Sequence, residues 1–246
     1  MLKYLLLLLT MMTAATITKA QSFTIDGFDG KTKEIHLYVG DETLTFIYLK
    51  DTLHISNFNN LIGKIAISNK NFLKVVYRIR AGTGIDDQHT LLLCVDDKKL
   101  YQSLYLTSVF NEDFIDFSKK VNPSDPVAMK SRYRLFLNLD GSESEGFNLN
   151  IKIHDAKKSK LLPKENYNID KQVVLKFDFQ KKIFYNIHKT ISQHFKIFDP
   201  KTQIETNKFI SGTFPAIELG KSAYYFIKNQ WYEKNKYGDL STYTYK

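Results

Sequence analysis

The sequence contains a single cysteine, Cys94, so no disulfide can form within one chain. This residue stands in an apolar run at positions 91–95, where a cysteine usually acts as a small buried hydrophobe. A nucleophilic thiol needs an accessible, electropositive setting, which this run does not provide. We therefore expect Cys94 to be a buried free thiol.

Arginine is also scarce. The chain carries a formal net charge of +9 with 35 Lys and Arg residues, but its only arginines are Arg78, Arg80, Arg132 and Arg134. Arginine is the usual side chain for binding phosphate or guanine through paired hydrogen bonds, whereas lysine is a strongly hydrated point charge. Because the lysines are spread along the chain, no nucleic-acid partner is expected, and a weak affinity for anionic surfaces or acidic glycans stays open.

Signatures of several catalytic classes are missing. The chain has no Gly-x-Ser-x-Gly, His-Glu-x-x-His or Cys-x-x-Cys motif. Gly82 and Gly84 lie between two strand patterns, whereas a phosphate-binding loop leads into a helix. Asp87 and His89 would share one face of an extended chain, with Asp86 on the other, and two ligands are too few for zinc. We expect neither a metal site nor a cofactor.

Long apolar runs are absent except at the N-terminus. Residues 1–20, MLKYLLLLLTMMTAATITKA, show the cation, apolar core and small residues of a secretory signal peptide, with cleavage before Gln21. The continuous apolar run is much shorter than the roughly 20 residues that a spanning helix needs. We expect an exported bacterial envelope or secreted protein, periplasmic or extracellular, with no transmembrane helix in the mature chain.

Alternation with a period of two dominates the rest of the chain, as in β-strands. In the clearest hairpin, apolar residues from Tyr133 to Leu139 and from Phe147 to Ile153 alternate with a solvent-facing set. That set is Arg134, Phe136, Asn138, Asn148, Asn150 and Lys152. A second hairpin is predicted over 173–187. The pattern predicts an all-β fold, an antiparallel sandwich or barrel-like sheet of about 12–14 strands with at most one or two short helices.

One helix is predicted at 111–121, where Asn111 can serve as an N-cap and Pro123 would end the helix. The following segment, near 122–129, is the best linker candidate. We prefer a single domain over 21–246. The alternative is two lobes, at about 21–121 and 130–233, and in either case 234–246 is expected to be a flexible tail.

Two groups of residues are candidates for ligand contact. Asp87 and His89 lie in a predicted loop at the rim of the sheet, where recognition residues often occur. Tyr225, Trp231 and Tyr232 belong to an aromatic cluster that would suit protein or sugar recognition. For both groups a plain structural role competes with this interpretation: a solvated loop for the first and core packing for the second.

The leading hypothesis is a non-catalytic binding or structural module whose ligand is a glycan or an envelope protein. The alternative is a carbohydrate-active hydrolase that brings carboxylates together from separate strands. Candidate carboxylates are Glu112, Asp113 and Asp116, and the pair Glu143 and Glu145. A small outer-membrane barrel is a third hypothesis, weakened by predicted strands shorter than the roughly 9–11 residues of a span.

Overall fold

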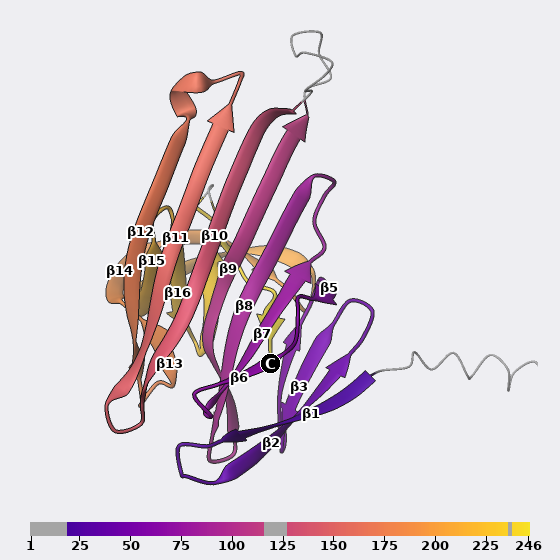
Figure 1. The fold of residues 1–246 in the computed structure, drawn as a ribbon, viewed down its shortest axis with the longest axis vertical. Coiled ribbons are helices and arrows are strands. Elements are labelled where there is room, and N and C mark those ends of the chain that lie inside the picture. Colours follow the sequence, from indigo (N-terminus) through magenta and orange to yellow (C-terminus); the bar gives the residue numbers. More distant parts are fainter. Residues whose placement is uncertain (1–18, 116–126, 236–237) are drawn as a thin grey trace, which may run out of the picture.

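A computed structural model describes residues 19–115, 127–235 and 238–246 and shows an all-β fold (Figure 1). The predicted all-β class is thus confirmed, although the described residues form 19 strands rather than the predicted 12–14. The single helical element among these residues is the three-residue 3-10 helix η1 (Pro163–Glu165). No helix in the described part of the chain has the length and apolar character needed to cross a membrane.

The largest element is a nine-stranded antiparallel sheet, called here the long sheet, in which β7 to β13 are neighbours in chain order. Its strands are β5 (Phe58–Leu61), β6 (Ala66–Ser68), β7 (Phe72–Ile79), β8 (Ile85–Asp96), β9 (Lys99–Ile115), β10 (Val127–Ser142), β11 (Gly146–Ser159), β12 (Tyr167–Asp178) and β13 (Ile183–Tyr185). Several of these strands, of up to 17 residues, are longer than the sequence predicts.

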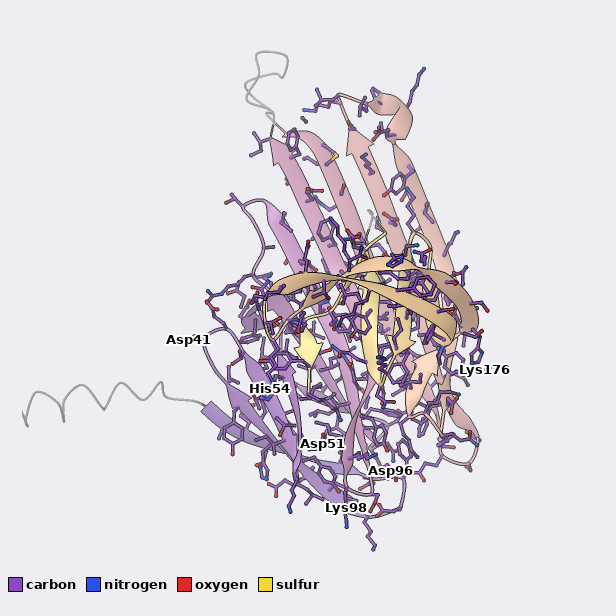
Figure 2. All side chains as sticks on the ribbon, turned by 180° about the vertical axis from the view of Figure 1, so that it is seen from behind. Asp41, Asp51, His54, Asp96, Lys98 and Lys176 are labelled. Carbon is purple, nitrogen blue, oxygen red and sulfur yellow. The ribbon has the colours of Figure 1, made fainter. Side chains whose placement is uncertain are left out.

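Two smaller groups of strands accompany the long sheet. A five-stranded sheet contains β1 (Lys19–Asp26), β2 (Thr32–Val39), β3 (Leu44–Tyr48), β4 (Asp51–Ile55) and β19 (Thr244–Tyr245). A closed barrel contains β14 (Ile187–Asp199), β15 (Ile204–Leu219), β16 (Ser222–Ile227), β17 (Gln230–Lys234) and β18 (Leu240–Ser241). Strands β14 and β15 run across the back of the long sheet, whereas its front is open (Figures 1 and 2).

The alternation in the sequence sets which face of the long sheet is buried. The predicted hairpin is the β10–β11 pair, with Leu135 opposite Ile153 and Leu137 opposite Ile151. Leu135, Ile151 and Ile153 are buried in one core that also draws residues from the five-stranded sheet and from β15 to β17. Burying such a side chain stabilises the fold by about 1.5–3 kcal/mol relative to leaving it exposed.

The helix predicted at 111–121 is wrong for residues 111–115, which form the end of β9. This segment pairs with both neighbours, Asn111 facing Asp86 on β8 and Arg132 on β10. Arg132 also binds Asp113 at 2.6 Å. Two sheet neighbours outweigh the local helix signals here. Residues 116–121 and the linker candidate at 122–126 lie outside the described residues, and 127–129 already belong to β10.

The C-terminal end differs from the flexible tail that the sequence predicts. Thr244 pairs with Ile55 of β4, and the buried Gln102 side chain donates a hydrogen bond to the Thr244 hydroxyl at 2.9 Å. The ring of Tyr245 stacks on His54, with ring centroids 5.0 Å apart (Figure 2 labels His54). Residues 238–246 are therefore held by the sheet and by side-chain contacts, although most of them are polar or tyrosine.

Candidate ligand-binding surface

The open face of β10, β11 and β12 presents the residues that the sequence predicts to face solvent. Because directly opposed residues of antiparallel strands project to the same face, their side chains form rows across the three strands. We call this surface the outer platform. Its rows are Lys130 and Lys158; Arg132, Ala156 and Asn168; Arg134, His154 and Asp170; Phe136, Lys152 and Gln172; Asn138, Asn150 and Val174; and Asp140, Asn148 and Lys176.

The chemistry of the outer platform is mixed. Phe136 is 57% exposed and Val174 is 45% exposed, which is unusual for side chains of this size. Amide side chains occupy five positions around them: Asn138, Asn148, Asn150, Asn168 and Gln172. An exposed aromatic ring beside amide donors and acceptors can bind a ligand with both apolar and hydroxyl-bearing surfaces, because amides donate and accept hydrogen bonds.

One end of the outer platform is hollowed. A depression of about 540 Å³ is lined by Lys130 and Arg132 of β10, Ala156 and Lys158 of β11, and Asn168 of β12. We call it the Ala156 hollow, because the small side chain of Ala156 stands at the centre of its row. No Asp or Glu of the described residues lines it. The charged side chains that line the hollow are therefore all basic.

A second, smaller depression of about 300 Å³ lies between β10 and β7. Phe136 and Arg134 of β10 line it together with Val76 and Lys74 of β7 and Gln88 of β8. Again no carboxylate lines the depression. The open side of the long sheet thus offers two hollows that meet at β10.

Asp87 and His89 do not lie in a solvated loop, as the sequence suggests, but in β8. Their side chains share one face, as predicted, and His89 Nε2 lies 3.1 Å from Asp87 Oδ1. Asp86 faces the other way and binds Arg78 at 2.8 Å. His89 is 1% exposed because it is stacked between the rings of Tyr77 and Tyr105. Its burial comes from neighbouring strands, which the local sequence does not reveal.

This histidine belongs to a buried polar network that joins the long sheet to the barrel. Thr107 of β9 lies 3.5 Å from His89 Nδ1 and donates a hydrogen bond to Glu233 of β17 at 2.8 Å. Tyr224 of β16 donates to the other oxygen of Glu233 at 3.1 Å. Burial raises the pKa of the Glu233 carboxyl, and the nearby His89 opposes this rise.

The predicted aromatic cluster lies in the packed interior. Trp231 is fully buried, with its ring 5.2 Å from that of Phe226, and Tyr225 is buried in the barrel. Tyr232 is partly buried against the same barrel core. None of the three belongs to the outer platform or lines the hollows described above.

Two of the remaining candidate carboxylates, Glu143 and Asp113, are each bound to a neighbouring side chain. Within the described ranges, no three His, Cys, Asp or Glu side chains are arranged to hold a metal ion. Glu143 accepts a hydrogen bond from Asn71 at 2.7 Å, and Asp113 binds Arg132. Asp116 lies outside the described residues. Cys94 is free and buried, so the predicted buried thiol is confirmed, and this burial raises the pKa of the thiol to about 12.

Comparisons with family models, with curated proteins and with solved structures found no match for this chain. The candidate surface therefore rests on its own geometry and chemistry. The sequence predicted about a third of the platform as a solvent-facing set, namely the six residues Arg134, Phe136, Asn138, Asn148, Asn150 and Lys152 of β10 and β11. It missed the Ala156 hollow, because cross-strand neighbours depend on the register between β10, β11 and β12.

Proposed function

We propose that this chain is a non-catalytic binding module that binds a glycan on the outer platform. The observation that carries the proposal is an uncovered three-strand face that combines exposed Phe136 with rows of amide side chains. Aromatic rings pack on the apolar faces of sugars, and amides hydrogen-bond to hydroxyl groups. The strands hold these side chains in fixed rows, so little order is lost on binding.

The alternative, a carbohydrate-active hydrolase, needs two carboxylates roughly 5–9.5 Å apart across one cleft. Both hollows on the open side of the long sheet are lined without any carboxylate of the described residues. This arrangement supports binding without hydrolysis. Release of reducing sugar from any polysaccharide that the purified protein binds would contradict the proposal.

The binding test compares two exposed phenylalanines. Phe136 on the platform and Phe209 on the barrel strand β15 are 57% and 58% exposed. Phe136→Ala should lower the affinity for the polysaccharide at least about tenfold, equivalent to about 1.4 kcal/mol. The measurement is the retardation of the protein in native gels that contain the polysaccharide. Phe209→Ala should bind like the wild type. Equal loss in both variants, or no binding to any polysaccharide tested, would overturn the proposal.

We also propose that the module is exported by its N-terminal leader to the periplasm or beyond. Cleavage before Gln21 would remove Lys19 and Ala20, the first residues of β1, and leave the pairing of β1 with β2 from Gln21 onward. N-terminal sequencing of protein from the culture medium or periplasm of an expressing bacterium should begin at Gln21. Recovery of the uncleaved chain in the cytoplasm alone would contradict export.

A further inference from the structure

The charge on the outer platform is uneven along the strands. Its first two rows contain Lys130, Lys158 and Arg132 and no carboxylate, whereas its last row contains Asp140 beside Asn148 and Lys176. Eight residues separate Lys130 from Asn138, or about 26–27 Å along a strand. A long ligand on this surface would meet cations without a carboxylate at one end, and amides beside both Asp140 and Lys176 at the other.

Lys130 and Lys158 are directly opposed across β10 and β11. Like charges in such a pair destabilise an antiparallel sheet, because their β-carbons lie only about 4.5–5.5 Å apart. Lys130 is also directly opposed to Asp113 across β10 and β9. The Asp113 carboxylate, however, is bound to Arg132 at 2.6 Å. No ion pair of Lys130 or Lys158 with another described residue relieves this repulsion. A bound anion would relieve it.

The Arg132 guanidinium is held in place beside the two lysines. One of its nitrogens binds Asp113, and another donates to the carbonyl oxygens of Ser131 at 2.9 Å and Glu112 at 3.3 Å. Ala156 is the smallest side chain that lines the hollow. We expect a longer side chain at this position to fill part of the space. Asn168, at the end of the same row, adds an amide donor.

Resting on the proposed function, we propose that the Ala156 hollow binds the acidic groups of an anionic glycan, with Lys130 and Lys158 as its cations. The ligand class is a polysaccharide that carries carboxylate or sulfate groups, because these anions accept hydrogen bonds from lysine and amide donors. Phe136 and the amide rows then contact the neutral part of the same chain. Anionic phospholipid would offer similar charges, and the experiment separates the two sources.

The experiment uses the mature protein with polygalacturonate and with alginate, each compared with its methyl ester. The methyl esters keep the sugar chain and remove the charge. Titration calorimetry should show at least tenfold tighter binding to the acidic forms at low salt, and raising the salt should weaken only that binding. Lys158→Ala and Ala156→Leu should each lower affinity for the acidic forms about tenfold and leave affinity for the methyl esters unchanged.

Matched controls make the result decisive. Lys171→Ala removes an exposed lysine of β12 that does not line the hollow and should bind like the wild type. Lys158→Arg should retain the preference for the acidic forms. Unchanged far-ultraviolet circular dichroism and melting temperature show that each variant folds. If the leucine variant does not fold, Ala156→Val replaces it as a smaller change that still fills part of the hollow.

Equal affinity for acidic and esterified forms would overturn the acidic-site proposal and leave glycan binding by the platform intact. Binding to vesicles containing phosphatidylglycerol without binding to either acidic polysaccharide would also overturn it. Absence of binding to every polysaccharide would defeat the proposed function as well, so the two failures are distinguishable.

Discussion

On β10 and β11, adjacent residues of the same strand meet opposite environments. Leu135 and Ile153 are packed in the core, whereas Arg134 and Lys152, one residue away from each, face solvent on the outer platform. Both sets contain polar and apolar members, because Phe136 lies outside and Tyr133 inside. Hydrophobicity alone therefore does not distinguish the two faces. They differ because the inner face is covered by the five-stranded sheet and the barrel strands.

Charged groups on the two sides have different surroundings. On the inner side, Glu233 accepts hydrogen bonds from both Thr107 and Tyr224, because burial makes an unpaired carboxylate costly. On the outer platform, Lys130 and Lys158 are opposed without a carboxylate between them. Glu233 thus stabilises the contact between sheet and barrel, whereas Lys130 and Lys158 form no ion pair with another described residue.

The largest effect on stability is expected for Trp231, the largest of the fully buried side chains. Trp231→Ala should lower the free energy of unfolding by about 3–5 kcal/mol, since it leaves a cavity in the core. Phe136→Ala should change it by less than about 0.5 kcal/mol. Urea unfolding followed by circular dichroism measures both, and a similar loss in the two variants would contradict the comparison between the faces.

A smaller effect is expected in the buried network. Thr107→Val keeps the shape but removes the hydroxyl that binds Glu233, so the free energy of unfolding should fall by about 1–3 kcal/mol. Thr190 is the control, because its hydroxyl pairs with Thr213 at 2.9 Å on an exposed part of the barrel. If Thr190→Val is as costly in urea unfolding as Thr107→Val, burial is not what makes the inner hydroxyl matter.

The same network should make stability depend on pH. Burial raises the pKa of Glu233 in the folded chain above its usual value of 4.5, which applies to the unfolded chain. At a pH between the unfolded and the folded pKa, the folded chain holds a proton that the unfolded chain has lost. The free energy of unfolding should therefore fall as the pH rises above about 4.5 and level off above the folded pKa. Glu233→Gln should remove this part of the slope in urea unfolding measured from pH 4 to pH 8, whereas Glu218→Gln, on the barrel surface, should keep it.

The smallest effect is expected at Tyr105. Its buried hydroxyl has no hydrogen-bond partner among the described residues, although its ring stacks on His89. Because an unpaired buried hydroxyl is itself unfavourable, Tyr105→Phe should leave the free energy of unfolding within about 0.5 kcal/mol of the wild type or raise it. A loss above about 1 kcal/mol would show that a bound water satisfies this hydroxyl.

Alternation predicted much of the fold because it is a local property. The pairing of Leu135 with Ile153 follows from two apolar series and one turn, all within 133–153. The burial of His89 could not be predicted in this way. It depends on Tyr77, Tyr105 and Glu233, which come from three other strands, and its own neighbours Asp87 and Gln88 are polar.

The candidate surface was partly predictable for the same reason. Arg134, Phe136 and Asn138 were expected to face solvent, but the sequence does not show that no other layer covers them. The Ala156 hollow needs the register of three strands, which sets Arg132 and Asn168 on either side of one small residue. The small size of Ala156 indicates a hollow only in combination with its cross-strand neighbours Arg132 and Asn168.

The pairing of β19 with β4 has a consequence for the order of folding. Thr244 pairs with Ile55, and Lys246 binds Asp51 at 2.7 Å, so the sheet begun by the earliest strands is completed by the last residues of the chain (Figure 2 labels Asp51). Contacts between residues so distant in sequence slow folding, because a long loop must close before they form. During synthesis the five-stranded sheet stays incomplete until residues 244–246 are available, and its edge at β4 is open to other strands until then.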